Sequence, residues 1–168
     1  NATLVTMDER RPVLDNGSLV IDQGVIAHIG RKTPPAGLDI KERIDCSGQI
    51  VMPGLVNAHC HLLEVLQKSF RDNARLEIWR EYRMLTEESA HLGPEEVRAA
   101  SELACGELLK SGVTAVVDHF STRLGPDPEM MRAVIDAFDR VGIRGILAPA
   151  LRDQNPLTLI ESRSARRK

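Results

Sequence analysis

The sequence predicts an α/β chain in which a small all-β portion, residues 1–52, precedes parallel βαβ units. Short β-branched runs separated by turn residues fill the first 52 residues, whereas helical and strand patterns alternate after them. The run Val113–Val117 is apolar and rich in β-branched residues, which is typical of a parallel strand buried on both faces. These observations favour α/β over a helical bundle or an all-β fold.

The first 52 residues are expected to form a small β-sandwich portion. Asp15-Asn16-Gly17 predicts a turn, and Gln23-Gly24 predicts a two-residue hairpin loop. Prolines and a glycine between residues 32 and 39 predict a loop. The predicted strands are residues 2–7, 18–22, 25–30, 43–45 and 49–51.

The second portion, residues 53–168, is predicted to contain three βα units. Gly93-Pro94-Glu95-Glu96 begins a helix, because proline suits the first helical position and acidic side chains suit the first turn; Gly112 ends it. Asp127-Pro128-Glu129 begins the next helix, which ends at Gly142. The strands are predicted near residues 55–60, 113–118 and 143–148.

A longer charged stretch separates His61 from Gly93, and it predicts two helical pieces, residues 62–70 and 75–89. Such an insertion would lie over the carboxyl ends of the strands, where loops carry specificity. Trp79 is the only tryptophan and lies in this stretch. Two interpretations stay open for Trp79, an anchor that packs the segment onto the domain and a substrate contact.

Composition excludes several classes of partner. A formal net charge of −2 gives no electrostatic reason to expect nucleic acid or a membrane surface, and an aromatic content of 3% leaves few platforms for base stacking. No apolar run is long enough to span a bilayer, and the N-terminus has no secretory signal pattern. The expected location is therefore cytoplasmic.

The three cysteines, Cys46, Cys60 and Cys105, are odd in number and widely spaced. This spacing argues against a disulfide framework, and it matches neither a zinc ribbon nor a zinc finger. We expect three free thiols in packed positions.

The segment that carries the chemistry ends in two histidines separated by one residue, His59 and His61. Side chains alternate between the faces of an extended strand, so these two imidazoles share a face while Cys60 points the other way. Two imidazoles on one face can bind a single cation, at about 2.0–2.1 Å per nitrogen if the cation is zinc. A His-x-His pair also occurs by chance on solvated strand faces, but here it closes a strand-like run that follows a Pro-Gly step.

The whole stretch Pro53-Gly54-Leu55-Val56-Asn57-Ala58-His59-Cys60-His61 resembles the signature that ends the first barrel strand in the amidohydrolase superfamily. Within that superfamily it is most similar to the branch of aminohydrolases and chlorohydrolases that act on purines, pyrimidines and s-triazines. The resemblance extends from Ala2 to about Pro156, and only the His-x-His segment is highly specific.

This resemblance implies a (β/α)₈ TIM-type barrel, a divalent metal held by His59 and His61, and hydrolysis at a ring carbon of a small N-heterocyclic substrate. Zinc is the expected metal, with iron as the alternative. Deamination or dechlorination would then proceed by attack of metal-activated water. The remaining metal ligands and the acid–base residues of the family come from later strands, so the catalytic residues are expected to lie beyond the end of this chain.

A further histidine, His119, lies at the end of the second predicted barrel strand. Asp118-His119 lies at the edge where barrel enzymes place their active sites, so His119 is a candidate substrate contact; the alternative is a loop residue with a local hydrogen bond. The resemblance places no metal ligand at this position. Asp118 could orient a neighbouring histidine, although an ordinary strand-end role is the stronger expectation. His28 and His91 are expected on the surface.

A complete barrel takes about 250 residues, whereas this chain has 168 residues in all. We therefore expect the first three βα units of a truncated barrel, an N-terminal fragment that is inactive alone. An alternative from another class is a non-catalytic domain that self-associates through its open strand edges, as a homo-oligomer. A structural zinc module is disfavoured, because Cys46 and Cys105 lie far from the histidine pair in sequence.

Overall fold

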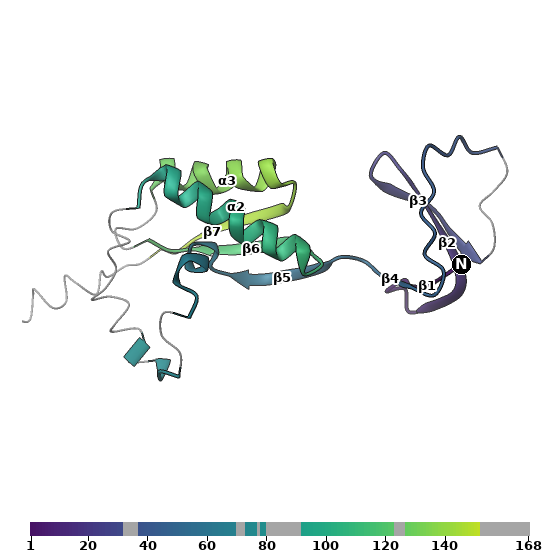
Figure 1. The fold of residues 1–168 in the computed structure, drawn as a ribbon, viewed down its shortest axis with the longest axis horizontal. Helices are drawn as coiled ribbons and strands as arrows, with labels where there is room; N and C mark the ends of the chain where they lie inside the picture. Colours follow the sequence, from purple (N-terminus) through teal and green to yellow (C-terminus); the bar gives the residue numbers. More distant parts are fainter. Residues whose placement is uncertain (32–36, 70–72, 77, 80–91, 123–126, 152–168) are drawn as a thin grey trace, which may run out of the picture. The chain divides into compact units, whose positions relative to one another are not determined.

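The computed structural model describes residues 1–31, 37–69, 73–76, 78–79, 92–122 and 127–151. The chain divides into two compact units, Asn1–Gly54 and Leu55–Lys168 (Figure 1). The sequence puts the domain boundary two residues earlier, between residues 52 and 53, and that assignment of domains stays a prediction. In the described part of the chain, no helix is both long enough and apolar enough to cross a membrane.

The N-terminal unit contains a four-stranded sheet with the order β3-β2-β1-β4. Its antiparallel β2–β3 hairpin turns at Gln23 and Gly24, whose φ values of 48° and 79° suit a two-residue loop. This hairpin is therefore confirmed. The strands are β1 (Ala2–Val5), β2 (Val13–Asp22), β3 (Val25–Arg31) and β4 (Ile50–Val51).

Two local predictions for this unit are wrong. Asp15-Asn16-Gly17 forms no turn but lies inside β2, where Asn16 has a φ of 53° and the register against β1 shifts. A bulge explains both features, because the extra residue in one strand takes an unusual backbone conformation. Residues 43–45 form no strand; instead the Asp45 carboxylate accepts hydrogen bonds from the backbone N–H and hydroxyl of Ser47. The second layer of a sandwich stays a prediction.

The C-terminal unit has the predicted α/β fold with a parallel sheet, in the order β5-β6-β7. Helices α2 and α3 pack side by side against one face of this sheet (Figure 1). The bounds are β5 (Leu55–Cys60), α2 (Pro94–Lys110), β6 (Val113–Phe120), α3 (Pro128–Val141) and β7 (Arg144–Pro149).

The predicted helix ends are confirmed, and each has a local cause. The Gly93 N–H donates to the Glu96 carboxylate at the start of α2. The Asp127 carboxylate accepts hydrogen bonds from two N–H groups in the first turn of α3, at 2.9 and 3.0 Å. At the other end of α3, Gly142 has a φ of 79°, a conformation that glycine adopts without steric cost.

The core of this unit lies between the sheet and the two helices. Burial in this core orients the side chains of β6: alternate residues face the helices, and the residues between them point to the opposite face of the sheet. The core residues include Leu62, Val97, Cys105, Val116, Phe120, Val134, Phe138 and Ile143.

The first helical piece predicted after β5, residues 62–70, is present in shorter form. It is a 3₁₀-helix, η1 (Leu62–Gln67). Most of the second predicted piece, residues 75–89, lies outside the described residues, as does His91.

Candidate metal centre

The histidine pair lies at the carboxyl end of β5, on the sheet face opposite the core. Cys60 packs against the core, so the residues on either side of it point away from α2 and α3. His61 follows the strand with φ −120° and ψ 94°, so the extended conformation and its alternation continue through it. The ring centroids of His59 and His61 lie 5.0 Å apart, as the alternation predicts.

His119 reaches the same face from the neighbouring strand. Val116, Asp118 and Phe120 of β6 are buried, which turns His119 away from the core. Cys60 pairs with Asp118 in the parallel register, so the residues that follow them, His61 and His119, are neighbours across the sheet.

The three imidazoles form a compact cluster. The His119 ring centroid lies 5.3 Å from that of His59 and 4.9 Å from that of His61. One ring nitrogen from each histidine can be chosen so that all three lie within 4.8 Å of one another. His59 is exposed, and His61 and His119 are half-buried. From sequence alone His119 is a candidate substrate contact; its closeness to the pair depends on the register between β5 and β6, which no local sequence signal specifies.

Asp118 of β6 forms a hydrogen bond with the backbone just after β5. Its carboxylate is 1% exposed and accepts a hydrogen bond from the Leu62 N–H at 3.0 Å, directly after His61. Its second oxygen, Oδ2, is buried and accepts no hydrogen bond from the described residues. Burial raises the pKa of Asp118 to about 6, against smaller lowering effects of the Leu62 hydrogen bond and the charge of His61. Asp118 thus holds the backbone beside the cluster.

The nearby thiols are not suited to metal binding. Burial raises the pKa of Cys60, and burial together with the Asp118 carboxylate raises that of Cys105 to about 11. The position of both thiols is the stronger reason: Cys60 packs against the core and Cys105 is buried within it, away from the imidazoles. All three cysteines are free, as predicted; Cys105 is buried, and Cys46 and Cys60 are half-buried.

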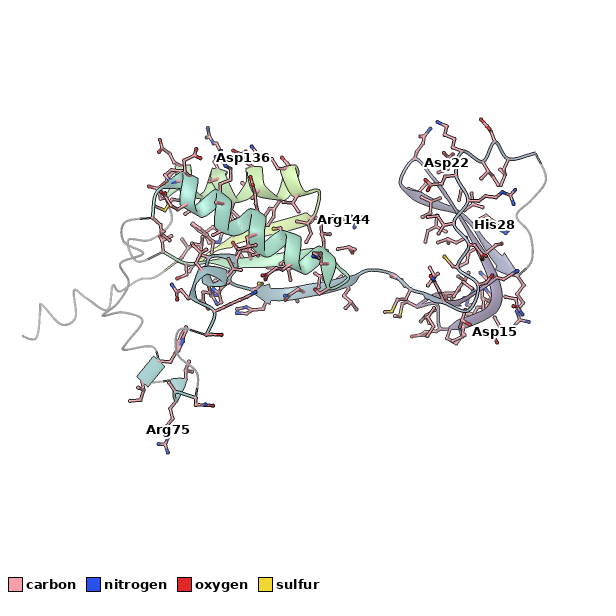
Figure 2. The ribbon with its side chains drawn as sticks, in the orientation of Figure 1. Asp15, Asp22, His28, Arg75, Asp136 and Arg144 are labelled. Carbon is pink, nitrogen blue, oxygen red and sulfur yellow. The ribbon has the colours of Figure 1, made fainter. Side chains whose placement is uncertain are left out.

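The other residues singled out in the sequence lie elsewhere. Trp79 follows η1, and its backbone N–H donates to the Arg75 carbonyl at 2.8 Å; its contact with substrate stays a prediction. His28 lies on β3 in the N-terminal unit, where it pairs with Val20 (Figure 2).

A scan against protein families matches residues 50–167, which include all three clustered histidines, to the amidohydrolase family. The chain belongs to the amidohydrolase family. The match covers more than half of the 168 residues, and it confirms the resemblance carried by the His-x-His segment.

Curated relatives of this amidohydrolase chain include the 5-methylthioadenosine/S-adenosylhomocysteine deaminases of Bacillus cereus and Bacillus anthracis. Each is 33% identical over 151 residues, which are 90% of this chain and 34% of the relative. The chain thus spans about a third of the length of the curated relatives it matches.

Solved structures share the fold. A variant of atrazine chlorohydrolase from Arthrobacter aurescens TC1, in complex with zinc and atraton, aligns with a TM-score of 0.72 and 22% identity over 87% of this chain and 33% of that protein. A zinc-bound adenosine deaminase from Xanthomonas campestris aligns with a TM-score of 0.61 and 22% identity, over 86% of this chain and 32% of the deaminase. Guanine deaminase from Escherichia coli aligns with a TM-score of 0.61 and 23% identity, over 83% and 31%.

The residues of the cluster fit a divalent metal. Neutral imidazoles are common zinc ligands, and the three nitrogen donors converge at the carboxyl ends of two parallel strands. Zinc is also bound in two of the neighbouring structures. The geometry of the three donors is thus suited to a divalent metal.

Proposed function

We propose that this chain provides part of the active site of a metal-dependent hydrolase that cleaves non-peptide carbon–nitrogen bonds, by deamination or dechlorination of an N-heterocycle. The observation that carries the proposal is the convergence of His59 and His61 on the sheet face opposite the helices, at the carboxyl ends of parallel strands. In α/β folds, ligands bind beyond these strand ends. Membership of the amidohydrolase family supports the reaction class.

In this proposal His59 and His61 hold the metal, with zinc favoured over iron. A bound divalent metal supplies a Lewis acid that makes water nucleophilic near neutral pH. The Asn57 side-chain oxygen accepts a hydrogen bond from the backbone N–H of His59 at 3.2 Å, and Asp118 accepts one from the backbone N–H of Leu62, so the backbone at both histidines is positioned by neighbours. His119 faces the same point and contacts whatever occupies the site, ion or substrate. Trp79 is retained as a proposed substrate contact.

The substrate class rests on the relatives. Their names specify 5-methylthioadenosine and S-adenosylhomocysteine, and one structural neighbour binds atraton. A small nitrogen heterocycle is common to these, and we propose one as the substrate here; the chain spans about a third of the length of these deaminases. The proposed architecture is the first three βα units of a TIM-type barrel, in a cytoplasmic protein.

The metal assignment is tested by zinc analysis of the purified chain. We expect weak or substoichiometric zinc in the wild type, and less in His59→Ala and His61→Ala. His28→Ala is the matched control, because His28 lies on β3 of the other unit (Figure 2). Unchanged zinc in both site variants would remove the assignment.

Activity of the isolated chain is tested separately. We expect no ammonia release from a panel of aminopurines and aminotriazines, because this chain spans a third of its deaminase relatives and supplies no identified acid–base group. Zinc-dependent ammonia release that disappears in His59→Ala would contradict this expectation.

Self-association is the second candidate, and exposed apolar side chains on the outer strands favour it. Leu55 and Val56 of β5 are 50% and 70% exposed, and Ile146 of β7 is 63% exposed. Such edges can pair with another copy of the chain. Light scattering at several concentrations tests this: a mass that rises with concentration, and falls again in Val56→Lys, supports association, whereas a monomer throughout counts against it.

A further inference from the structure

We infer that His119 is a third metal ligand in this chain, which gives a three-imidazole site built entirely by β5 and β6. This inference rests on the proposed function, because it concerns the same metal. It goes beyond the family resemblance, which places metal ligands at His59 and His61 but none at the end of the second barrel strand. The inference rests on strand register, ring geometry and the chemistry of the donors.

The register between β5 and β6 is sufficient to place His119 beside His59 and His61. Cys60 is paired with Asp118, and both side chains face the helices. The next residue on each strand therefore points to the opposite face at the same level of the sheet. The hydrogen bond from the backbone N–H of Leu62, just after the end of β5, to Asp118 within β6 stabilises this register.

The ring geometry is close to that of a chelate. The three centroid separations, 5.0, 5.3 and 4.9 Å, are nearly equal, so no histidine stands apart from the other two. Zinc–nitrogen bonds of about 2.0–2.1 Å in a tetrahedron put the donor atoms about 3.3 Å apart. The donors lie within 4.8 Å of one another, so each pair must close by at most about 1.5 Å, which small side-chain rotations accomplish.

The donor chemistry also suits zinc. Three histidines with a fourth position left open for water or substrate form one of the recurrent catalytic zinc sites. Cys60 packs against the core and Cys105 lies within it, so imidazoles are the suitable donors among these side chains. A third imidazole would let this part of the chain hold zinc without the ligands that the resemblance assigns to later strands.

X-ray absorption spectroscopy of the zinc-loaded wild-type chain counts the ligands directly. Three imidazoles per zinc are expected, whereas two imidazoles with only oxygen donors beside them would overturn the inference. This measurement needs no substitution, so a variant that fails to fold cannot obscure it.

Zinc affinity gives a second, independent test, measured by competition with a chromophoric chelator. His119→Ala should weaken binding at least about tenfold, since even the loss of a partner that only orients a ligand costs about 10–100-fold. His119→Cys should recover part of the affinity because a thiolate can replace the imidazole, and His28→Ala should leave it unchanged. Circular dichroism of each variant at 222 nm checks that α2 and α3 are intact.

The outcomes separate this inference from the proposed function. If His59→Ala and His61→Ala weaken zinc binding and His119→Ala does not, His119 is no ligand and the proposed metal pair stands. If His119→Ala instead weakens only the binding of a heterocycle to the zinc-loaded chain, His119 is a substrate contact and the inference is overturned. If none of the three substitutions changes zinc affinity, both the inference and the metal assignment fail.

Discussion

Asp118 offers a stringent test of the structure, because a buried carboxylate links stability to pH. Its side chain is 1% exposed, one oxygen accepts the Leu62 N–H, and Oδ2 has no hydrogen bond from the described residues. Burial raises its pKa from 3.8 to about 6. The folded chain therefore binds more protons than the unfolded chain between these two values, so this group makes the protein less stable as the pH rises from about 4 to 6.

The substitution Asp118→Asn removes this titration while keeping an oxygen that can accept the Leu62 N–H. The full difference between pKa values of 3.8 and about 6 corresponds to at most about 3 kcal/mol. The free energy of unfolding of Asp118→Asn, relative to the wild type, should therefore increase by up to about 3 kcal/mol between pH 4 and pH 7. The buried amide can carry its own cost, but that cost does not depend on pH.

Urea unfolding followed at 222 nm at several pH values, with a chelator present to remove metal, measures this difference. The signal reports the C-terminal unit, because both described α-helices, α2 and α3, belong to it. Asp136→Asn is the matched control, since Asp136 is exposed on α3 (Figure 2). A difference for Asp118→Asn that stays constant from pH 4 to pH 7, or shrinks as the pH rises, would refute the assigned burial of this carboxylate.

Two further predictions concern packing and capping around α3. Gly145→Ala should destabilise the C-terminal unit by about 1–3 kcal/mol, because a Cβ at that position would lie 2.1 Å from Phe138 Cδ2. Gly106→Ala in α2 meets no atom within 4 Å, so it should stabilise the helix by about 0.5–1 kcal/mol; equal effects of the two substitutions in urea unfolding would contradict this. Asp127→Ala should lower the free energy of unfolding by about 1 kcal/mol, because the side chain caps two N–H groups, and Asp127→Asn should stay close to the wild type. An Asp127→Ala variant as stable as the wild type would show that this cap does not stabilise α3.

Local sequence signals predicted the elements whose causes are themselves local. Asp127 and Gly142 bound α3 by interactions within a few residues, and Gln23-Gly24 closes a hairpin between adjacent strands. The pairing of His59 with His61 on one face likewise follows from alternation along a single strand. Such features depend little on the rest of the chain.

The wrong predictions concern segments whose structure depends on pairing with a strand distant in sequence. Asp15-Asn16-Gly17 is a typical turn sequence, yet Asn16 forms part of a bulge in β2. The reason is that β1 pairs with β2 both before and after Asn16, at Leu14 and at Gly17. Residues 43–45 look strand-like, but the neighbour of β1 on that side is the short β4, residues 50–51. Which strands pair, and over what length, is set by tertiary packing.

The histidine cluster likewise has one part that local sequence determines and one part that depends on tertiary structure. The sequence alone determined that two imidazoles on β5 share a face, since that requires only the two-residue period of an extended chain. The position of His119 beside them depends on the parallel register that pairs Cys60 with Asp118, and on the core that turns both of those side chains toward α2 and α3. A register between strands far apart in sequence is fixed by the burial of whole faces and by contacts such as Leu62 N–H to Asp118, so only the tertiary structure decided that three histidines converge.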